Sequence, residues 1–211
     1  MCGDRDNAQP LSRFVRFGKL LRRYAVGLCA RRITGEFFMR TRIIHLINPK
    51  TDSLTTRPIY LNRALYSPLA GLLAVAASIP RDQYEVVLTD ENIEPIDFDL
   101  KADLVGISAM TSYVKRGYEI AHQFRDNGVP VVMGGVHPSF MPQEALKHCD
   151  AVVIGEVELV IDKLLDDLKQ GAMRGTYKSD TLHPMAGMPM PRYDLLDAEQ
   201  LLPGRRSVRG V

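Results

Sequence analysis

Five short runs of Val and Ile, each bounded by turn residues, constrain this chain more than any other feature. They are RIIHLIN at 42–48, YEVVLT at 84–89, DLVGISA at 103–109, VPVVM at 129–133 and DAVVIG at 150–155. Near-continuous apolar character, in place of strict alternation, is typical of parallel strands covered on both faces. Because helical patterns follow most of these runs, the sequence predicts an α/β fold with a doubly wound, mainly parallel, five-stranded sheet.

The beginning of the chain differs in charge from the remainder. Residues 1–42 carry ten Lys or Arg and three acids, whereas the rest carries seventeen Lys or Arg and twenty-two acids. Apolar residues recur here at helical spacing, so this leader could lie on an anionic membrane surface. The plainer alternatives are a frayed extension, or residues upstream of a start at Met39. We expect a leader at 1–41, a folded domain at 42–175 and a linker at 176–211.

Composition and cysteine spacing narrow the class of protein. Hydrophobic residues make up 45% of the chain and charged residues 25%, which is typical of a globular protein. The longest apolar run, at 67–80, is too short to cross a bilayer. Cys2, Cys29 and Cys149 form no CxxC pair, which favours a reducing cytoplasm over a disulfide framework or a thiolate metal site. We expect a cytoplasmic protein, with peripheral membrane contact through the leader as an option and no nucleic-acid partner.

Common nucleotide-binding and hydrolase motifs are missing from the sequence. No GxGxxG follows the first expected strand, and no GxxxxGK[ST] occurs. A phosphoryl-accepting receiver domain would want acids at the ends of the first and third strands, where this chain has Asn48 and Ser108. Neither HExxH nor a Ser-His-Asp order appears among the scattered histidines. These absences disfavour dinucleotide binding, P-loop phosphoryl transfer and hydrolysis.

Glycines gather where the expected strands end. They are Gly106, Gly134, Gly135 and Gly155. Missing side chains there let a large, flat or elongated ligand approach the backbone, although any one of them alone could be an ordinary turn glycine. In doubly wound sheets, ligands bind outside the carboxyl ends of the strands. A ligand is therefore expected at the loops 48–66, 108–112, 134–140 and 155–158.

The segment from ADLVGISAM to IDKLL resembles the N-terminal cobalamin-binding domain of cobalamin-dependent radical SAM enzymes. In that family a strand ends in GGxH, a P-x-E-A-L helix follows, and the next strand ends in a GEGE-like turn. The matching residues here are Gly134, Gly135 and His137, then Pro142, Glu144, Ala145 and Leu146, then Gly155, Glu156, Val157 and Glu158. The resemblance covers about 42–196 and looks most like the hopanoid C-3 methylases, which modify a membrane lipid.

Three departures from the family pattern carry consequences. Val157 replaces a glycine of the GEGE turn, Leu54 stands where the cobalt-ligating histidine of DxHxxG would be, and no CxxxCxxC occurs anywhere. Cobalamin would therefore bind without a histidine ligand from the loop after the first strand. The chain also lacks the three thiolates that hold a 4Fe-4S cluster. The resemblance thus implies a radical SAM barrel, in cis or in trans, which would bring the 4Fe-4S cluster and S-adenosylmethionine.

The resemblance implies a flavodoxin-like cobalamin-binding fold, with the corrin over the carboxyl edge of the sheet. The nucleotide tail would pass the third and fourth strands, where Gly134 and Gly135 make room for it. His137 could donate a hydrogen bond to the tail or to nearby backbone, ligate cobalt, or be a loop residue held by packing. The expected cobalamin contacts are Asn48, Lys50, Ser108, Ala109, Met110, Thr111, Gly134, Gly135, Val136, His137, Gly155 and Glu156.

The implied parent enzyme moves a methyl group from S-adenosylmethionine through cobalt to an unactivated carbon, or performs a related radical step. This chain would be its cobalamin-binding portion. A different class of function is a standalone cobalamin carrier or sensor that passes a methyl group or a signal to another protein. A third is a flavodoxin-like fold that has lost its ligand. An apolar patch where a barrel should dock favours the first, and a polar, self-contained surface favours the second.

Overall fold

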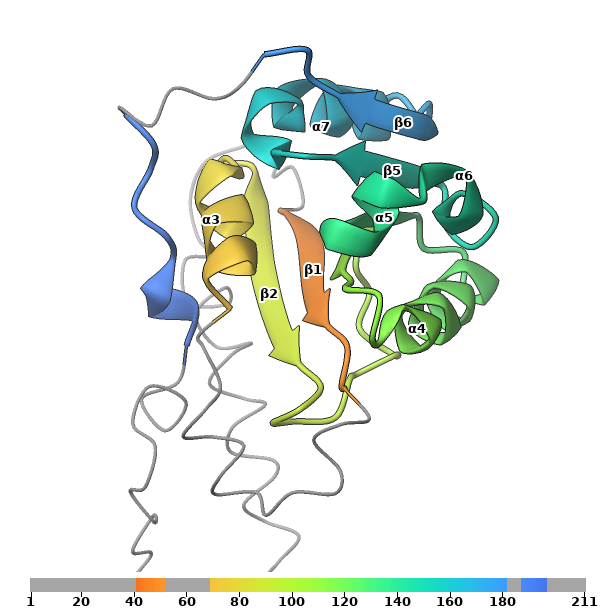
Figure 1. Ribbon diagram of the computed structural model, residues 1–211. Coiled ribbons are helices and arrows are strands. Elements are labelled where there is room, and N and C mark those ends of the chain that lie inside the picture. Colours follow the sequence, from red (N-terminus) through yellow and green to blue (C-terminus); the bar gives the residue numbers. More distant parts are fainter. Residues whose placement is uncertain (1–40, 52–68, 182–186, 197–211) are drawn as a thin grey trace, which may run out of the picture. The chain divides into compact units, whose positions relative to one another are not determined.

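Figure 1 shows the computed structural model of the protein, which describes residues 41–51, 69–181 and 187–196. Its centre is a six-stranded sheet in the order β2-β1-β3-β4-β5-β6, and every pairing is parallel. The strands are β1 (Arg42–Asn48), β2 (Tyr84–Asp90), β3 (Leu104–Ser108), β4 (Val131–Gly134), β5 (Ala151–Ile154) and β6 (Gly175–Lys178). The predicted α/β doubly wound sheet is confirmed. The predicted leader and Leu54 lie outside the described residues.

The sixth strand corrects the expected strand count. β6 is the segment Gly-Thr-Tyr-Lys, in which Tyr177 alone is buried. An edge strand with one buried side chain lacks the continuous apolar run that marks the other strands, so the sequence pattern missed it. The tyrosine hydroxyl donates a hydrogen bond of 2.7 Å to Asp167 Oδ2. Burial, together with this bond, raises the pKa of Tyr177 to about 12.

Helices cover both faces of the sheet. The chain contains α3 (Ala70–Ser78), α4 (Val114–Asp126), α5 (Val136–Phe140), α6 (Pro142–Ala145) and α7 (Ile161–Lys169), with 3-10 turns η3 (Val157–Leu159) and η4 (Tyr193–Leu195). Buried side chains of α3 and α7 share one core cluster, and those of α4 and α6 share another. In Figure 1, α4, α5 and α6 lie to the right of β1 and α3 lies to its left. Among the described helices, none is long and apolar enough to span a bilayer.

Alternation along the strands divides the core into these two clusters. In β5, Val153 packs with α3 and α7, whereas its neighbour Val152 packs with α4. The same alternation separates Val132 from Val131 in β4. Successive side chains of a strand point to opposite faces, so a sheet with two covered faces buries both sets. This explains why the strand sequences are apolar almost throughout.

The segment after β4 is a helix, which corrects the expectation of a loop at 134–140. Gly135 adopts a φ of 97°, and the chain turns there directly from β4 into α5. Glycine reaches this conformation without the steric penalty that other residues meet. Within α5, His137 and Pro138 are buried. The motif therefore builds a packed element at the carboxyl edge of the sheet.

Residues 187–196, in the expected linker, lie against α3. The backbone amide of Arg192 donates a hydrogen bond of 3.1 Å to the carbonyl of Leu73. Leu195 and Leu196 pack against the core cluster that α3 shares with the sheet. The Arg192 guanidinium contacts Asp194 at 2.8 Å. We refer to residues 187–196 as the strap.

Candidate functional site

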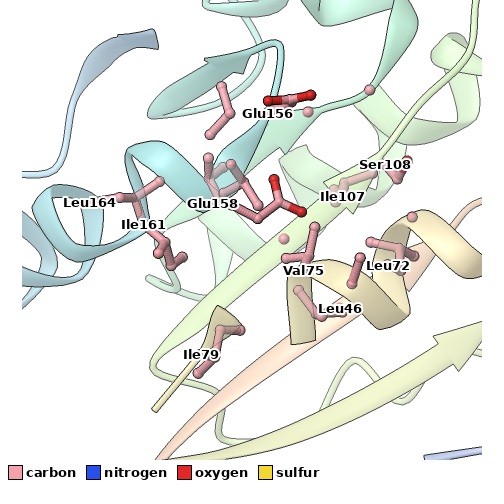
Figure 2. Close-up of a pocket in the computed structure, with 18 of the residues that line it drawn as sticks. Leu46, Leu72, Val75, Ile79, Ile107, Ser108, Glu156, Glu158, Ile161 and Leu164 are labelled. Atoms are coloured by element: carbon pink, nitrogen blue, oxygen red, sulfur yellow. The ribbon is translucent and has the colours of Figure 1, made fainter. Parts of the chain in front are cut away.

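An apolar cavity of about 270 Å³ opens between the sheet and the helices α3 and α7 (Figure 2). Its floor consists of side chains from four strands, namely Ile44, Leu46, Leu104, Val132 and Val153. Its walls are Leu72, Val75 and Ile79 from α3, and Ile161 and Leu164 from α7. All of these side chains are hydrocarbon. Such a lining favours an apolar or aromatic group over a charged one.

Polar side chains among the described lining residues are confined to the carboxyl edge of the sheet. They are Ser108 at the end of β3, and Glu156 and Glu158 after β5. In Figure 2 the carboxylate of Glu158 faces Val75 and Ile107. The cavity thus has a polar mouth and an apolar depth. A ligand with an apolar end and a polar remainder would match this arrangement.

Gly134 and Gly106 keep the cavity open. A Cβ built on Gly134 would meet only Val153, whose Cβ lies 3.9 Å away. A Cβ on Gly106 would lie 2.8 Å from Leu46 Cδ2, another lining atom. Any larger side chain at either position would therefore occupy the cavity or push its floor inward.

Gly135 has a different reason to be glycine. Its Cβ would lie 2.9 Å from the carbonyl oxygen of Ala109 and 3.1 Å from its nitrogen, and its φ is 97°. Both the conformation and the contact exclude a side chain, whatever the ligand. Ala109 is fully buried beneath this turn. Its carbonyl accepts a hydrogen bond of 3.1 Å from the backbone amide of His137.

The structure brings together the two motif residues His137 and Glu144. His137 is 7% exposed, and its Nδ1 lies 3.3 Å from Thr111 Oγ1. Its Nε2 lies 3.4 Å from Glu144 Oε1, without hydrogen-bond geometry. The imidazole packs edge-on against Tyr118, with ring centroids 6.3 Å apart. Neither His137 nor Glu144 lines the cavity.

Tyr118 connects these motif residues to a surface histidine pair. Its hydroxyl donates a hydrogen bond of 3.1 Å to Glu144 Oε1, and burial together with this bond raises the pKa of Tyr118. Its ring stacks on His148 with centroids 3.9 Å apart, and His148 Nδ1 lies 2.9 Å from His122 Nε2. Burial and the neighbouring His122 lower the pKa of His148. The sequence pattern missed Tyr118, because a tyrosine on the apolar face of a helix reads as core.

Asn48 is bonded to the last residue of β2, and Lys50 to the loop that follows it. Asn48 is buried, and its Nδ2 donates a hydrogen bond of 3.0 Å to Asp90 Oδ1. The backbone amide of Lys50 donates one of 3.0 Å to Glu91 Oε2. Neither residue is part of the cavity lining. The side-chain amide of Asn48 is thus engaged within the protein, whereas Lys50 is exposed and is bonded here through its backbone amide.

Arg116 of α4 secures the same loop. Its guanidinium contacts Glu91 Oε1 at 2.6 Å. Burial acts to raise the pKa of Glu91, but the hydrogen bonds from Arg116 and the Lys50 amide outweigh it, so that the pKa is lowered. The ends of β1 and β2 are thereby fixed to α4.

The predicted contacts divide into three groups. Those that line the cavity are Ser108, Gly134, Gly135, Gly155 and Glu156. Met110, Thr111 and Val136 are exposed beside the turn. Asn48, Ala109 and His137 are buried within the protein, and Lys50 is exposed with its backbone amide bonded to Glu91. The walls from α3 and α7 were not predicted, since apolar helix faces look alike in sequence whether they pack tightly or leave a space. Within the described ranges, no three His, Cys, Asp or Glu residues cluster as metal ligands would.

Large apolar side chains are exposed around the β4–α5 turn. Met110 and Val136 are each 50% exposed, Met141 is 48% exposed and Phe140 is 80% exposed. They come from the β3–α4 connection and from α5 with its following residue. We call these four residues the apolar rim. Clustered exposed hydrophobic side chains commonly mark a surface that binds a ligand or a partner.

Comparison with known proteins gives consistent matches. The family model described as B12 binding domain matches residues 57–165. Bacteriochlorophyllide d C-8(2)-methyltransferase of Chlorobaculum tepidum is 39% identical over 114 residues, covering 54% of this chain and 25% of that protein. Bacteriochlorophyllide d C-12(1)-methyltransferase of the same organism is 32% identical over 151 residues, which cover 70% of this chain and 32% of that protein. An uncharacterized methyltransferase of Pyrococcus horikoshii is 31% identical over 191 residues, which cover 77% of this chain and 40% of that protein. The chain spans a quarter to two fifths of the length of these relatives.

Proposed function

Because this chain belongs to the B12-binding domain family, we propose that it binds cobalamin at the carboxyl edge of its sheet, with the nucleotide tail in the apolar cavity. The observation that carries the placement is the open space over Gly134. A Cβ there would project into the cavity with Val153 as its one neighbour within 4 Å. The chain has left this position bare without any demand from its own backbone, since φ at Gly134 is not positive.

The cavity suits the chemistry of the cobalamin tail. The tail ends in a bicyclic aromatic base, and the depth of the cavity offers hydrocarbon side chains from strands and helices. Removing an aromatic ring from water contributes favourably in proportion to the apolar area buried. The ribose and phosphate of the tail carry polar groups, which Ser108 at the mouth could meet with its hydroxyl. The residues present therefore fit the group.

The apolar rim would hold the corrin. Met110, Val136 and Phe140 expose apolar surface beside the mouth, where a corrin linked to a buried tail must lie. Methionine and phenylalanine side chains give such a macrocycle adaptable and flat contact surfaces. His137 would support this surface from below by holding α5 against Tyr118 and Thr111. In this account His137 is not a cobalt ligand.

The reaction class we propose is methyl transfer. When bound, cobalamin supplies a cobalt centre that can accept a methyl group and pass it on. This chain would bind and orient the cofactor and exclude water from its tail. A radical SAM barrel, in cis or in trans, would contribute the 4Fe-4S cluster and S-adenosylmethionine. A standalone carrier or sensor is the alternative, and it would use the apolar rim for the corrin in the same way; adding a separately produced barrel to the loaded chain and testing for methyl transfer distinguishes the two.

The acceptor we expect from the sequence resemblance is a hopanoid, methylated at C-3. A tetrapyrrole acceptor is the second candidate, because two of the matched methyltransferases have bacteriochlorophyllide in their names. The two differ in shape, since one is a flexible-tailed polycyclic lipid and the other a flat macrocycle. The chain can be assayed together with a radical SAM barrel, with each acceptor in turn. The acceptor that becomes methylated distinguishes the two candidates.

Cofactor binding can be tested with the full chain alone. The protein is mixed with hydroxocobalamin and passed through a gel-filtration column, and the visible spectrum of the protein peak is recorded. We expect corrin absorbance in the protein peak, with the bands of a corrin whose base has left the cobalt, because the base would lie in the cavity. A protein peak without corrin absorbance, or one with the base still on cobalt, contradicts the proposed placement.

A further inference from the structure

We infer that the cavity selects cobamides by their lower base, accepting a benzimidazole and discriminating against a purine. This inference rests on the proposed function, because it assumes that the tail enters the cavity. It goes further by assigning the selection to particular positions. The positions are the hydrocarbon side chains of the cavity depth, represented by Leu104, Val132 and Val153.

The depth of the cavity offers no side-chain hydrogen-bond partner among the described lining residues. Leu104 is 2% exposed, Leu164 1% and Val153 5%, and each presents only methyl and methylene groups. The polar lining residues Ser108, Glu156 and Glu158 follow the ends of β3 and β5 at the carboxyl edge, and the carboxylate of Glu158 faces Val75 and Ile107 there (Figure 2). A base that reaches the depth therefore meets hydrocarbon on its edges.

Backbone groups of the floor cannot replace the missing side-chain partners. The floor strands β1, β3, β4 and β5 pair with one another in parallel ladders, which engage their amides and carbonyls. Backbone groups inside α3 and α7 are engaged in the same way by their helices. A buried polar atom of the ligand would thus stay without a partner.

The two classes of base differ in what they present to such a lining. Dimethylbenzimidazole has a hydrocarbon edge with two methyl groups, whereas adenine has additional ring nitrogens and an exocyclic amino group. Burying such a group without a hydrogen bond is unfavourable, and a single group of this kind commonly weakens binding by about tenfold or more. We therefore expect an adenine-bearing cobamide to bind at least about tenfold more weakly than cobalamin.

Two adjacent valines of β5 provide a matched pair of variants. Val153 lines the cavity, while Val152 is fully buried on the opposite face of the sheet. Threonine has nearly the shape of valine but carries a hydroxyl in place of one methyl group, which makes the site more polar. Val153→Thr places that hydroxyl where a purine nitrogen could use it, so the preference for cobalamin should narrow several-fold. Val152→Thr should leave the preference unchanged, although it disturbs the core in a similar way.

The experiment is a set of spectroscopic titrations of the full chain with three corrinoids. These are cobalamin, the cobamide with adenine as its base, and cobinamide, which lacks the nucleotide. We expect tight binding of cobalamin, at least about tenfold weaker binding of the adenine cobamide, and weak binding of cobinamide. Thermal unfolding of each variant checks its fold. If Val153→Thr does not fold, the ratio of affinities in the unmodified chain decides by itself.

The outcomes separate this inference from the proposed function. If none of the three corrinoids binds, the proposed function fails. If all three bind equally, the tail does not use the cavity and the selection is overturned. If cobalamin and the adenine cobamide bind equally while cobinamide is weak, the proposed function stands and the selection fails. Tighter binding of the adenine cobamide, for example through its amino group and Glu158, also overturns the selection.

Discussion

Gly134 and Gly135 are adjacent, yet their bare Cα positions face opposite environments. A Cβ on Gly134 would lie 3.9 Å from Val153 Cβ, with open cavity around it, whereas a Cβ on Gly135 would lie 2.9 Å from the carbonyl oxygen of Ala109. The first glycine leaves the cavity open. The second serves the turn that starts α5. Two substitutions can therefore separate ligand binding from folding.

Replacing Gly134 by valine should weaken cobalamin binding without unfolding the protein. The valine side chain would enter the cavity, where the nearest existing atom leaves ordinary van der Waals space. We expect the affinity for cobalamin to fall at least about tenfold, and the free energy of unfolding to change by less than about 1 kcal/mol. Absorbance titration and urea denaturation measure the two quantities. Unchanged affinity in a folded variant would place the tail elsewhere.

Replacing Gly135 by alanine should destabilise the fold. At φ 97° and with a backbone contact of 2.9 Å, the added Cβ is strained in both conformation and packing. We expect a loss of about 1–3 kcal/mol in the free energy of unfolding. Gly171→Ala is the control, because Gly171 has a φ of 66° but nothing within 4 Å of its Cβ. Equal losses in the two variants would show that the contact with Ala109 contributes nothing.

The contact between Glu91 and Arg116 should make stability depend on acid pH. The pKa of Glu91 is lowered in the folded protein from an ordinary value of 4.5. The stabilisation that ionised Glu91 gives the folded protein is therefore fully present above about pH 4.5. It is lost as the pH falls through the lowered pKa that Glu91 has in the folded state. Glu91→Gln should reduce the free energy of unfolding by about 1–2 kcal/mol at pH 7, and the difference from the unmodified chain should shrink below pH 4.5.

Urea denaturation at pH 7, 5 and 3.5 measures this dependence. Glu119→Gln is the matched control, because Glu119 also contacts Arg116, at 2.7 Å, but its side chain is 64% exposed. An exposed ion pair contributes little, so this variant should change the free energy of unfolding by less than about 0.5 kcal/mol. A difference between Glu91→Gln and the unmodified chain that stays constant with pH would refute the assignment.

The strap should stabilise the wall of the cavity. Leu195 and Leu196 pack against the cluster that contains α3, and α3 supplies Leu72 and Val75 to the cavity. Replacing both strap leucines by alanine should lower the free energy of unfolding by about 1–3 kcal/mol and weaken cobalamin binding as well. Met190→Ala is the control, since Met190 is 79% exposed. A lower free energy of unfolding with an unchanged affinity for cobalamin would mean that α3 keeps its position in the folded protein without the strap.

The architecture could be predicted from sequence because parallel strands covered on both faces must be apolar on both sides. Val152 and Val153 illustrate this, since they are neighbours buried in different clusters. β6 escaped prediction because its one buried side chain, Tyr177, leaves no such pattern. Predicting strands from apolar runs therefore favours central strands over edges.

The site was harder to predict, because a cavity depends on what the apolar side chains fail to fill. Nothing in the sequence separates Leu72 and Val75, which line a space, from core residues that pack without one. Polar residues near strand ends were also ambiguous, because such a side chain can face a ligand or bond to a neighbouring strand. Asn48 was expected at the site, but its amide is bound to Asp90, a partner that lies 42 residues away in the chain. Of the glycines expected at the site, the structure separates Gly134, whose Cβ would meet open cavity, from Gly135, which the turn into α5 requires.

Amide hydrogen exchange of the full chain, with and without cobalamin, would locate the bound cofactor on the fold. If the tail lies in the cavity, exchange should slow with cobalamin in α3, in the β4–α5 turn and in residues 155–161, and should stay unchanged in residues 119–126 of α4 on the opposite face. Protection confined to other elements, or no change at saturating cobalamin, would contradict this placement.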